Sequence, residues 1–549
     1  MTLKTTYDES DKVNSIKTNY IFFESRFLIS KYFHFIIPAI YFVIMLFVSV
    51  TNRAIGDYGV ESDFYSSYIP QAKEILNGNI IIDPFKGPLY QIFLAVTGFV
   101  FGRDYFLAGK FLNVISAGVA LYFGSKLIGS ILNREAAFIT VLIIAVNYIF
   151  LTYTYTPNTD ILFLVFYISA LYFILKNEIL ENKNLFIAGL LTSFAYLTRY
   201  TAISLIIFAV FVFVLNLYKW SKKNKSEEKI SPPPIKPILF YFIPVIILTS
   251  VWGIISYNKT GFFFYNLNYQ NTSFTVHKPE NMSKYEWNEK YKDSFNSMSD
   301  VVLKDVGTFG KIIFLNNFPN YFKKDLTRLL PKYFGLFVVI GLVFFLIKFK
   351  SQIVLRKYFF LANFLFYLQI LLIFYAERFS IPLLPFYCFL IVWLFSIDQL
   401  QRFNFKIAGI KFFGFFLFVL IIFNLYNSIK SVKREINVGP TEILTIKNWV
   451  DKNNVEDVTG KLIMGRKPHI AYYLDMKFQV IPFVNNLDVF FKNVKDNNVD
   501  YIYISEKEAD YLTEANLKQI LLNYKNPPNE LEIVTYTESP IAILYKVKK

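Results

Sequence analysis

The sequence predicts a mostly α-helical membrane protein with about eleven membrane-spanning helices, followed by a small soluble α/β domain. Composition is the first reason: 54% of the 549 residues are hydrophobic and only 18% are charged, whereas about 25% are charged in a typical soluble protein. Patterning is the second reason, because apolar residues occur in long uncharged blocks such as IIPAIYFVIMLFVSV at 36–50. About 20 apolar residues are enough to cross the bilayer core as a helix.

Several segments are long and apolar enough to be predicted as spans. They lie at 30–51, 105–128, 135–153, 158–175, 185–198, 200–218, 236–257, 332–348, 356–375, 379–397 and 406–427. The stretch PLYQIFLAVTGFVFG at 88–102 is apolar but short, and it begins directly after Pro84 and Pro88. We therefore expect a re-entrant or interfacial helix there rather than a span.

The distribution of basic residues predicts the orientation, because cytoplasmic loops collect Lys and Arg. With a cytoplasmic N-terminus, every predicted inside loop carries cations, and the most basic is KWSKKNKSEEK at 219–229. We therefore expect a multi-pass protein of the plasma (inner) membrane. The predicted parts are a cytoplasmic segment 1–28, a transmembrane domain 29–428 with outer loops 52–104 and 258–331, and an extracytoplasmic domain 429–549.

Other features of the composition exclude several classes of protein. The net charge is +16, but the cations are spread over many short loops, which argues against a nucleic-acid partner. Cys388 is the single cysteine, so neither an intrachain disulfide nor a cysteine-based metal site is possible. The three histidines, His34, His277 and His469, show no ligand spacing.

The last 120 or so residues have the pattern of a small soluble α/β or α+β domain. Short runs rich in β-branched and aromatic residues predict strands, and amphipathic runs predict helices. The predicted strands are 461–465, 478–483, 499–505 and 540–547, and the predicted helices are 441–453 and 509–524. No glycine-rich phosphate loop occurs among them, so we expect a supporting role for this domain.

Acidic residues gather on the predicted outer face. The stretch GDYGVESDFYSSYIP contains Asp57, Glu61 and Asp63, and Asp160 opens a later span. Helix capping is a sufficient explanation for Asp63 or Asp160 alone, but not for Asp57 and Glu61. Two outer-face acids can serve as a general base and as an electrostatic or metal-binding partner, so a divalent cation stays open.

Cations lie at the same predicted face. Lys86 precedes a Gly-Pro pair, Arg199 lies where two spans meet, and Arg378 follows Glu377 at the start of a late span. A guanidinium group suits phosphate because it donates two parallel hydrogen bonds. The alternatives are anchoring in the head-group region and, for Glu377 and Arg378, pairing with other loops.

An ordered set of motifs resembles a known family. In sequence order they are ESDFYSSYIPQAKEILNG at 61–78, KGPLY at 86–90, TPNTDILF at 156–163, YLTRYTAI at 196–203 and ERFSIPLLPF at 377–386. Together they resemble the GT-C superfamily of integral-membrane glycosyltransferases. The resemblance covers roughly residues 30–400. It is to the branch of bacterial protein-mannosyltransferase-like and aminoarabinose-transferase-like enzymes, similar to glycosyltransferase family 39.

This resemblance implies a chemistry and assigns roles to residues. The expected donor is a sugar on a polyprenyl phosphate, and the acceptor is a lipid, a glycan or a protein in the cell envelope. Transfer inverts the anomeric centre on the outer side. Asp63 is the expected general base, with Glu61 as the alternative base or its partner, and Asp160 is the second acid. Lys86, Arg199 and Arg378 are expected to hold the departing phosphate. Tyr68, Glu377 and Asp57 complete the predicted substrate-binding set, and Asp57 is the third candidate for the base after Asp63 and Glu61.

Three other functions remain open at this point, and one of them is a non-catalytic membrane scaffold. A surface-polysaccharide polymerase or ligase would use related chemistry on another acceptor. A transporter or flippase would need a similar number of spans, but its ionisable residues would lie near the bilayer midplane.

Overall fold

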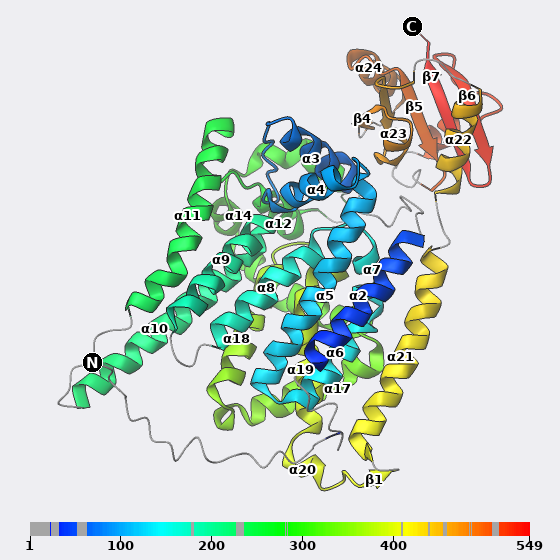
Figure 1. Ribbon diagram of the computed structural model, residues 1–549. Coiled ribbons are helices and arrows are strands. Elements are labelled where there is room, and N and C mark those ends of the chain that lie inside the picture. Colours follow the sequence, from blue (N-terminus) through cyan, green and yellow to red (C-terminus); the bar gives the residue numbers. More distant parts are fainter. Residues whose placement is uncertain are drawn as a thin grey trace.

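The computed structural model of the protein describes residues 22, 32–51, 63–176, 181–226, 235–279, 282, 284–407, 410–436, 440–453, 458–482, 484, 486–507 and 515–548. A bundle of long helices forms the body of the molecule, and a small sheet domain lies beyond one end of the bundle (Figure 1).

Helices occupy every segment that was predicted as a span. They are α2 (Phe33–Thr51), α5 (Tyr105–Ile131), α6 (Arg134–Ala145), α7 (Tyr148–Tyr155), α8 (Asp160–Leu175), α9 (Asn182–Thr198), α10 (Ile203–Ser226), α11 (Ile235–Thr260), α17 (Lys332–Ile347), α18 (Val354–Ile370), α19 (Leu384–Phe395) and α21 (Phe412–Ile436). By length and composition, 6 of the described spans could cross a membrane, or 7 if α6 and α7 count as one. The other apolar helices are shorter, so the number of eleven spans stays a prediction.

The segment predicted as one span at 135–153 is broken. Helices α6 and α7 meet at an angle of 64°, and Asn147 stands at the break. Its Oδ1 accepts a hydrogen bond from the Phe150 amide at 3.0 Å, and its Nδ2 donates to the Leu329 carbonyl at 2.7 Å. An asparagine that caps a new helix is a strong start signal, and it explains why the chain turns here.

The two predicted outer loops fold into short helices at one end of the bundle. Figure 1 shows α3, α4, α12 and α14 at that end, and α20 and β1 at the other. The elements are α3 (Ile69–Leu76), α4 (Leu89–Val100), α12 (Asn268–His277), α13 (Lys284–Tyr291), α14 (Met298–Lys304), α15 (Val306–Gly310) and α16 (Phe318–Lys324). Helix α4 has 12 residues, about 18 Å at 1.5 Å per residue, which is too short for a bilayer core of about 30 Å.

The opposite end carries α20 (Asp398–Gln401) and a hairpin of β1 (Lys406–Ile407) and β2 (Ile410–Lys411). Because of this hairpin, α21 begins at Phe412 rather than at 406, and it continues beyond the predicted boundary at 428. The predicted segment 1–28 lies outside the described residues except for Phe22, whose amide donates to the Glu135 carboxylate at 2.9 Å.

The C-terminal domain is built on a mixed sheet with strand order β4-β3-β5-β7-β6. Strand β3 pairs in parallel with β4 and β5, and β7 pairs antiparallel with β5 and β6. The strands are β3 (Leu462–Gly465), β4 (Lys477–Val480), β5 (Tyr501–Ser505), β6 (Leu531–Glu538) and β7 (Ile541–Val547), and the helices are α22 (Thr441–Lys452), α23 (His469–Tyr473), α24 (Leu487–Asp496) and α25 (Ala515–Leu521). Both faces of the sheet bury apolar residues, so this is an α/β domain as predicted.

Candidate active site

Asp63 begins the helical stretch that runs through the π-helical turn Phe64–Tyr68 into α3. Its carboxylate makes no capping hydrogen bond. It forms an ion pair with Lys86, whose ammonium also donates to the Tyr68 hydroxyl and lies 4.4 Å from the centre of the Tyr68 ring. Helix capping therefore does not explain Asp63. Its side chain is 44% exposed, against 13% for Lys86, so this carboxylate is accessible to a substrate.

The glycine of the KGPLY motif positions Lys86. A Cβ atom at Gly87 would overlap the backbone carbonyl of Leu197 in α9, so only glycine allows the loop to approach this closely. Asp83 shapes the preceding turn, because its carboxylate accepts from the Phe85 amide at 2.8 Å and from the Ser67 hydroxyl at 2.9 Å. The loop thus packs its backbone beside Lys86 against the C-terminal end of α9, while the Lys86 ammonium pairs with Asp63.

We expect Gly87→Ala to destabilise the protein by about 1–3 kcal/mol, the usual cost of forcing an extra methyl group into a packed region. Thermal unfolding in detergent measures this. Gly310→Ala is the matched control, because a Cβ there would meet no heavy atom within 4 Å. Equal unfolding midpoints for the two variants would contradict the close approach at Gly87.

Asp160 is the first residue of α8, and it forms an ion pair with Arg199. The cap of this helix comes from Asn158 instead, whose Oδ1 accepts from the amides of Asp160 at 2.9 Å and Ile161 at 3.1 Å. The side chain of Asp160 is only 3% exposed, and its charge is favoured by the helix dipole. The geometry makes Asp160 a buried partner that holds Arg199 in position.

Arg199 and Arg378 come together on one aromatic ring. Their guanidinium carbons lie 4.9 Å and 5.0 Å from the centre of the Phe379 ring, a distance at which a cation is attracted to the ring face. Glu377 takes a different direction and forms an ion pair with Arg328 at 3.5 Å. Within the ERF motif, Arg378 therefore lines the site, whereas Glu377 links this segment to the one that carries Arg328.

These groups share a cavity of about 510 Å³. Its polar lining residues include Asp63, Ser67, Asp83, Lys86, Tyr196, Arg199, Tyr200, Asn266, Asn268, Asn271, Gln369 and Arg378. The structure thus brings together Asp63, Lys86, Arg199 and Arg378 from four separate motifs. Glu377, Asp160 and Tyr68 are not among the lining residues of this cavity. Tyr68 contacts the site indirectly, because its hydroxyl accepts a hydrogen bond from the Lys86 ammonium.

Several lining residues were not identified from the sequence. The loop 258–331 covers the cavity and is joined to the KGPLY loop, since the Leu267 amide donates to the Pro84 carbonyl at 2.8 Å and Asn268 Nδ2 donates to the Phe85 carbonyl at 3.0 Å. The run NLNYQN at 266–271 was the available signal. Asp83 could have been found from the turn sequence Asp-Pro that precedes Lys86.

A further carboxylate, Asp325, was also missed. It is fully buried and accepts hydrogen bonds from the hydroxyls of Tyr375 at 2.9 Å and Tyr387 at 2.8 Å. Burial raises the pKa of Asp325 to about 7, although these hydrogen bonds act in the opposite direction. Asp325 does not line the 510 Å³ cavity. It joins the loop 258–331 to the spans that carry the ERFSIPLLPF motif.

Two predicted acids, Asp57 and Glu61, lie outside the described residues. Among the residues that the structure does describe, no group of three or more His, Cys, Asp and Glu side chains could hold a metal ion. The histidines have other surroundings: His34 Nδ1 lies 2.8 Å from the Ser125 hydroxyl and His277 Nε2 lies 2.9 Å from the Val301 carbonyl.

The C-terminal domain contacts the segment that carries Asp63. Tyr65 packs against His469 and Tyr472 of α23, with ring centres 4.9 Å and 5.0 Å apart. Tyr65 is nearly buried and His469 is fully buried in this contact. Helix α23 thus covers the residue two positions after Asp63, and the supporting role of this domain stays a prediction.

Comparisons with known proteins bear on this fold. The sequence profile of the family described as dolichyl-phosphate-mannose-protein mannosyltransferase matches residues 85–247. The structure of ArnT from Cupriavidus metallidurans bound to undecaprenyl phosphate is similar with a TM-score of 0.52 at 10% identity, over 94% of this chain and 98% of ArnT. The archaeal oligosaccharyltransferase AglB from Archaeoglobus fulgidus, in complex with an inhibitory peptide and a dolichol-phosphate, gives 0.50 at 12% identity, over 95% of this chain and 75% of AglB. No curated protein matches the sequence significantly.

The chain therefore has the fold of the GT-C class of integral-membrane proteins, and its long apolar helices agree with that class. Within the class, it resembles the mannosyltransferase and ArnT-like branch, so the resemblance predicted from the sequence is confirmed. The side of the membrane on which the cavity opens stays a prediction.

Proposed function

We propose that this protein is an inverting glycosyltransferase that takes a sugar from a polyprenyl-phosphate-linked donor. The acceptor is a lipid, a glycan or a protein of the cell envelope, and the reaction occurs on the extracytoplasmic face. One observation carries the proposal: an accessible carboxylate, Asp63, and three cations, Lys86, Arg199 and Arg378, line the same cavity. The family profile and the lipid phosphates named with ArnT and AglB support a lipid-phosphate donor.

The reaction follows from these groups. Asp63 takes the proton from the acceptor hydroxyl while the hydroxyl oxygen attacks the anomeric carbon of the sugar. The bond from that carbon to the phosphate oxygen breaks at the same time. The departing phosphate gains negative charge, which Lys86 and the two guanidinium groups stabilise with preorganised hydrogen-bond donors. Attack from the side opposite to the phosphate inverts the anomeric centre. Both guanidinium groups contact the Phe379 ring and line the same cavity, which makes both available to the phosphate.

A transporter is the less favoured reading. Its ionisable residues would be expected near the middle of the membrane, whereas the distribution of basic residues predicts Asp63, Asp160 and Arg199 at the outer face. Comparison of glycolipids and glycoproteins from cells with and without the protein tests the proposal. We expect one glycoconjugate to lose a sugar in its absence. Identical glycoconjugates, with a solute or lipid accumulating on one side, would favour the transporter.

Lys86→Ala is expected to weaken the binding of undecaprenyl phosphate by about 10- to 100-fold. A hydrogen bond between charged groups contributes about 1.5–3 kcal/mol, and each 1.4 kcal/mol corresponds to about tenfold in affinity. Binding to the purified protein in detergent is the measurement. Lys73→Ala is the matched control, because Lys73 is an exposed cation of α3 that does not line the cavity. Equal losses in both variants, or none in either, would remove Lys86 from the phosphate site.

A further inference from the structure

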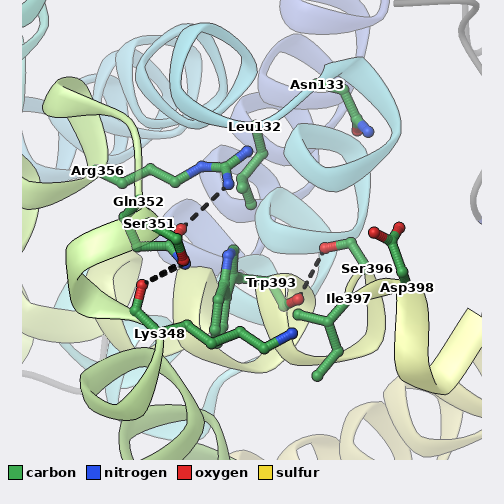
Figure 2. Close-up of a pocket in the computed structure, with 10 residues that line it drawn as sticks. All are labelled: Leu132, Asn133, Lys348, Ser351, Gln352, Arg356, Trp393, Ser396, Ile397 and Asp398. Atoms are coloured by element: carbon green, nitrogen blue, oxygen red, sulfur yellow. Dashed lines mark hydrogen bonds between the residues drawn. The ribbon is translucent and has the colours of Figure 1, made fainter.

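A second pocket lies at the end of the bundle opposite to the candidate active site. It has a volume of about 280 Å³ and is formed by three turns: the turn from α5 to α6, the turn from α17 to α18, and the turn from α19 to α20. Figure 2 shows its lining residues, among them Asn133, Lys348, Gln352, Arg356, Trp393 and Asp398. Each turn belongs to a loop that the distribution of basic residues predicts to be cytoplasmic.

The polar groups of the pocket carry both signs of charge. Arg356 donates from Nε to the Ile131 carbonyl at 3.3 Å and from Nη1 to Gln352 Oε1 at 3.2 Å. These two bonds orient the guanidinium and use two of its five N–H groups. Lys348 supplies a second cation, held by Gln399 Oε1 at 2.5 Å. Asp398 is an exposed carboxylate, and Figure 2 shows it on the opposite side of the pocket from Arg356.

The surroundings of the pocket are apolar. Trp393 and Ile397 are buried and form part of its wall. Next to its charged residues in the chain, Ile347 is 74% exposed, Ile353 49% and Val354 48%. In a membrane protein such side chains face acyl chains rather than water. A ligand that combines charged groups with acyl chains therefore matches this site better than a soluble ion.

We propose that this pocket binds the headgroup of a phospholipid that carries both a phosphate diester and a primary ammonium. Arg356 and Lys348 bind the phosphate, because guanidinium and ammonium groups both donate to it. Asp398 pairs with the ammonium, which explains why a carboxylate lies among two cations. The acyl chains lie along the exposed apolar side chains of α17 and α18. This site is independent of the proposed sugar transfer at the other end.

Lipid binding to the purified protein in detergent tests the proposal, with native mass spectrometry and thermal unfolding as readouts. Phosphatidylethanolamine is expected to bind and to raise the unfolding midpoint. Phosphatidylglycerol, which lacks the ammonium, and phosphoethanolamine, which lacks the acyl chains, are expected to bind at least tenfold more weakly. Phosphoethanolamine binding as tightly as the lipid would overturn the lipid assignment. Equal affinity for the two lipids would overturn the pairing with Asp398.

Two variants test the contacts with the phosphate and with the ammonium of the headgroup separately. Lys348→Gln is expected to weaken phosphatidylethanolamine binding about tenfold, and Asp398→Asn to abolish the preference over phosphatidylglycerol. The Lys348 side chain donates to Gln399 at the surface, and its other hydrogen bonds are made by the backbone, so its variant is expected to fold even if Arg356→Gln does not. Arg402→Gln is the matched control, because this exposed cation near the same end does not line the pocket. Wild-type affinity in Lys348→Gln and Arg356→Gln would overturn the proposal.

Discussion

Replacing Asp63 with asparagine is expected to lower the rate of sugar transfer by about 10²–10⁴-fold, the usual contribution of a positioned general base. The variant keeps the shape of the side chain but cannot accept the proton of the acceptor hydroxyl. Binding of undecaprenyl phosphate is expected to stay the same or to become tighter, because Lys86 no longer has a competing carboxylate partner. Transfer assays and donor binding together distinguish this result from misfolding.

The controls for this prediction use two nearby acids. Glu74→Gln changes a carboxylate of α3 that accepts a hydrogen bond from Asn79 and does not line the cavity, so it is expected to leave transfer unchanged. Glu61→Gln tests the alternative base. Loss of transfer in Glu61→Gln with full activity in Asp63→Asn would move the base to Glu61. Full activity in both variants would show that neither acid is the base.

The helices of the bundle were accessible from the sequence because each depends on a local apolar run. The break at Asn147 was not, since one asparagine within an apolar segment does not reveal whether it caps a helix or faces a neighbour. Strand β6 was also missed, although LEIVTYTE is rich in β-branched and aromatic residues. The signals for pairing strand β6 with β7 come from the assembled sheet rather than from the segment itself.

In the candidate site too, some features could be predicted from the sequence and others could not. Motif order placed Asp63, Lys86, Arg199 and Arg378 on one face, and the structure brings these four to one cavity. The sequence could not separate the roles of the two acids, because Asp63 and Asp160 both begin helices. Their exposure separates them: 44% for Asp63 and 3% for Asp160. Exposure depends on which distant side chain covers each carboxylate, and spacing along the chain contains no such information.

The low exposure of Asp160 leads to a prediction on stability. Arg199→Gln is expected to destabilise the protein by about 3–5 kcal/mol, because removing one partner of a buried ion pair leaves an uncompensated charge. The double variant Asp160→Asn with Arg199→Gln is expected to be closer to the wild type, since it removes both charges together. Thermal unfolding in detergent of the single and double variants forms a double-mutant cycle that isolates the pair. Additive effects would contradict a direct interaction.

The same pair predicts how the two acids differ in function. If Asp160 acts through Arg199, then Asp160→Asn weakens the binding of the lipid phosphate by letting the guanidinium move away from its place on the Phe379 ring. The Michaelis constant for the donor is expected to rise more than the turnover number falls, the reverse of the result for Asp63→Asn. A loss confined to turnover in Asp160→Asn would instead make Asp160 a second participant in the chemical step, despite its burial beneath Arg199.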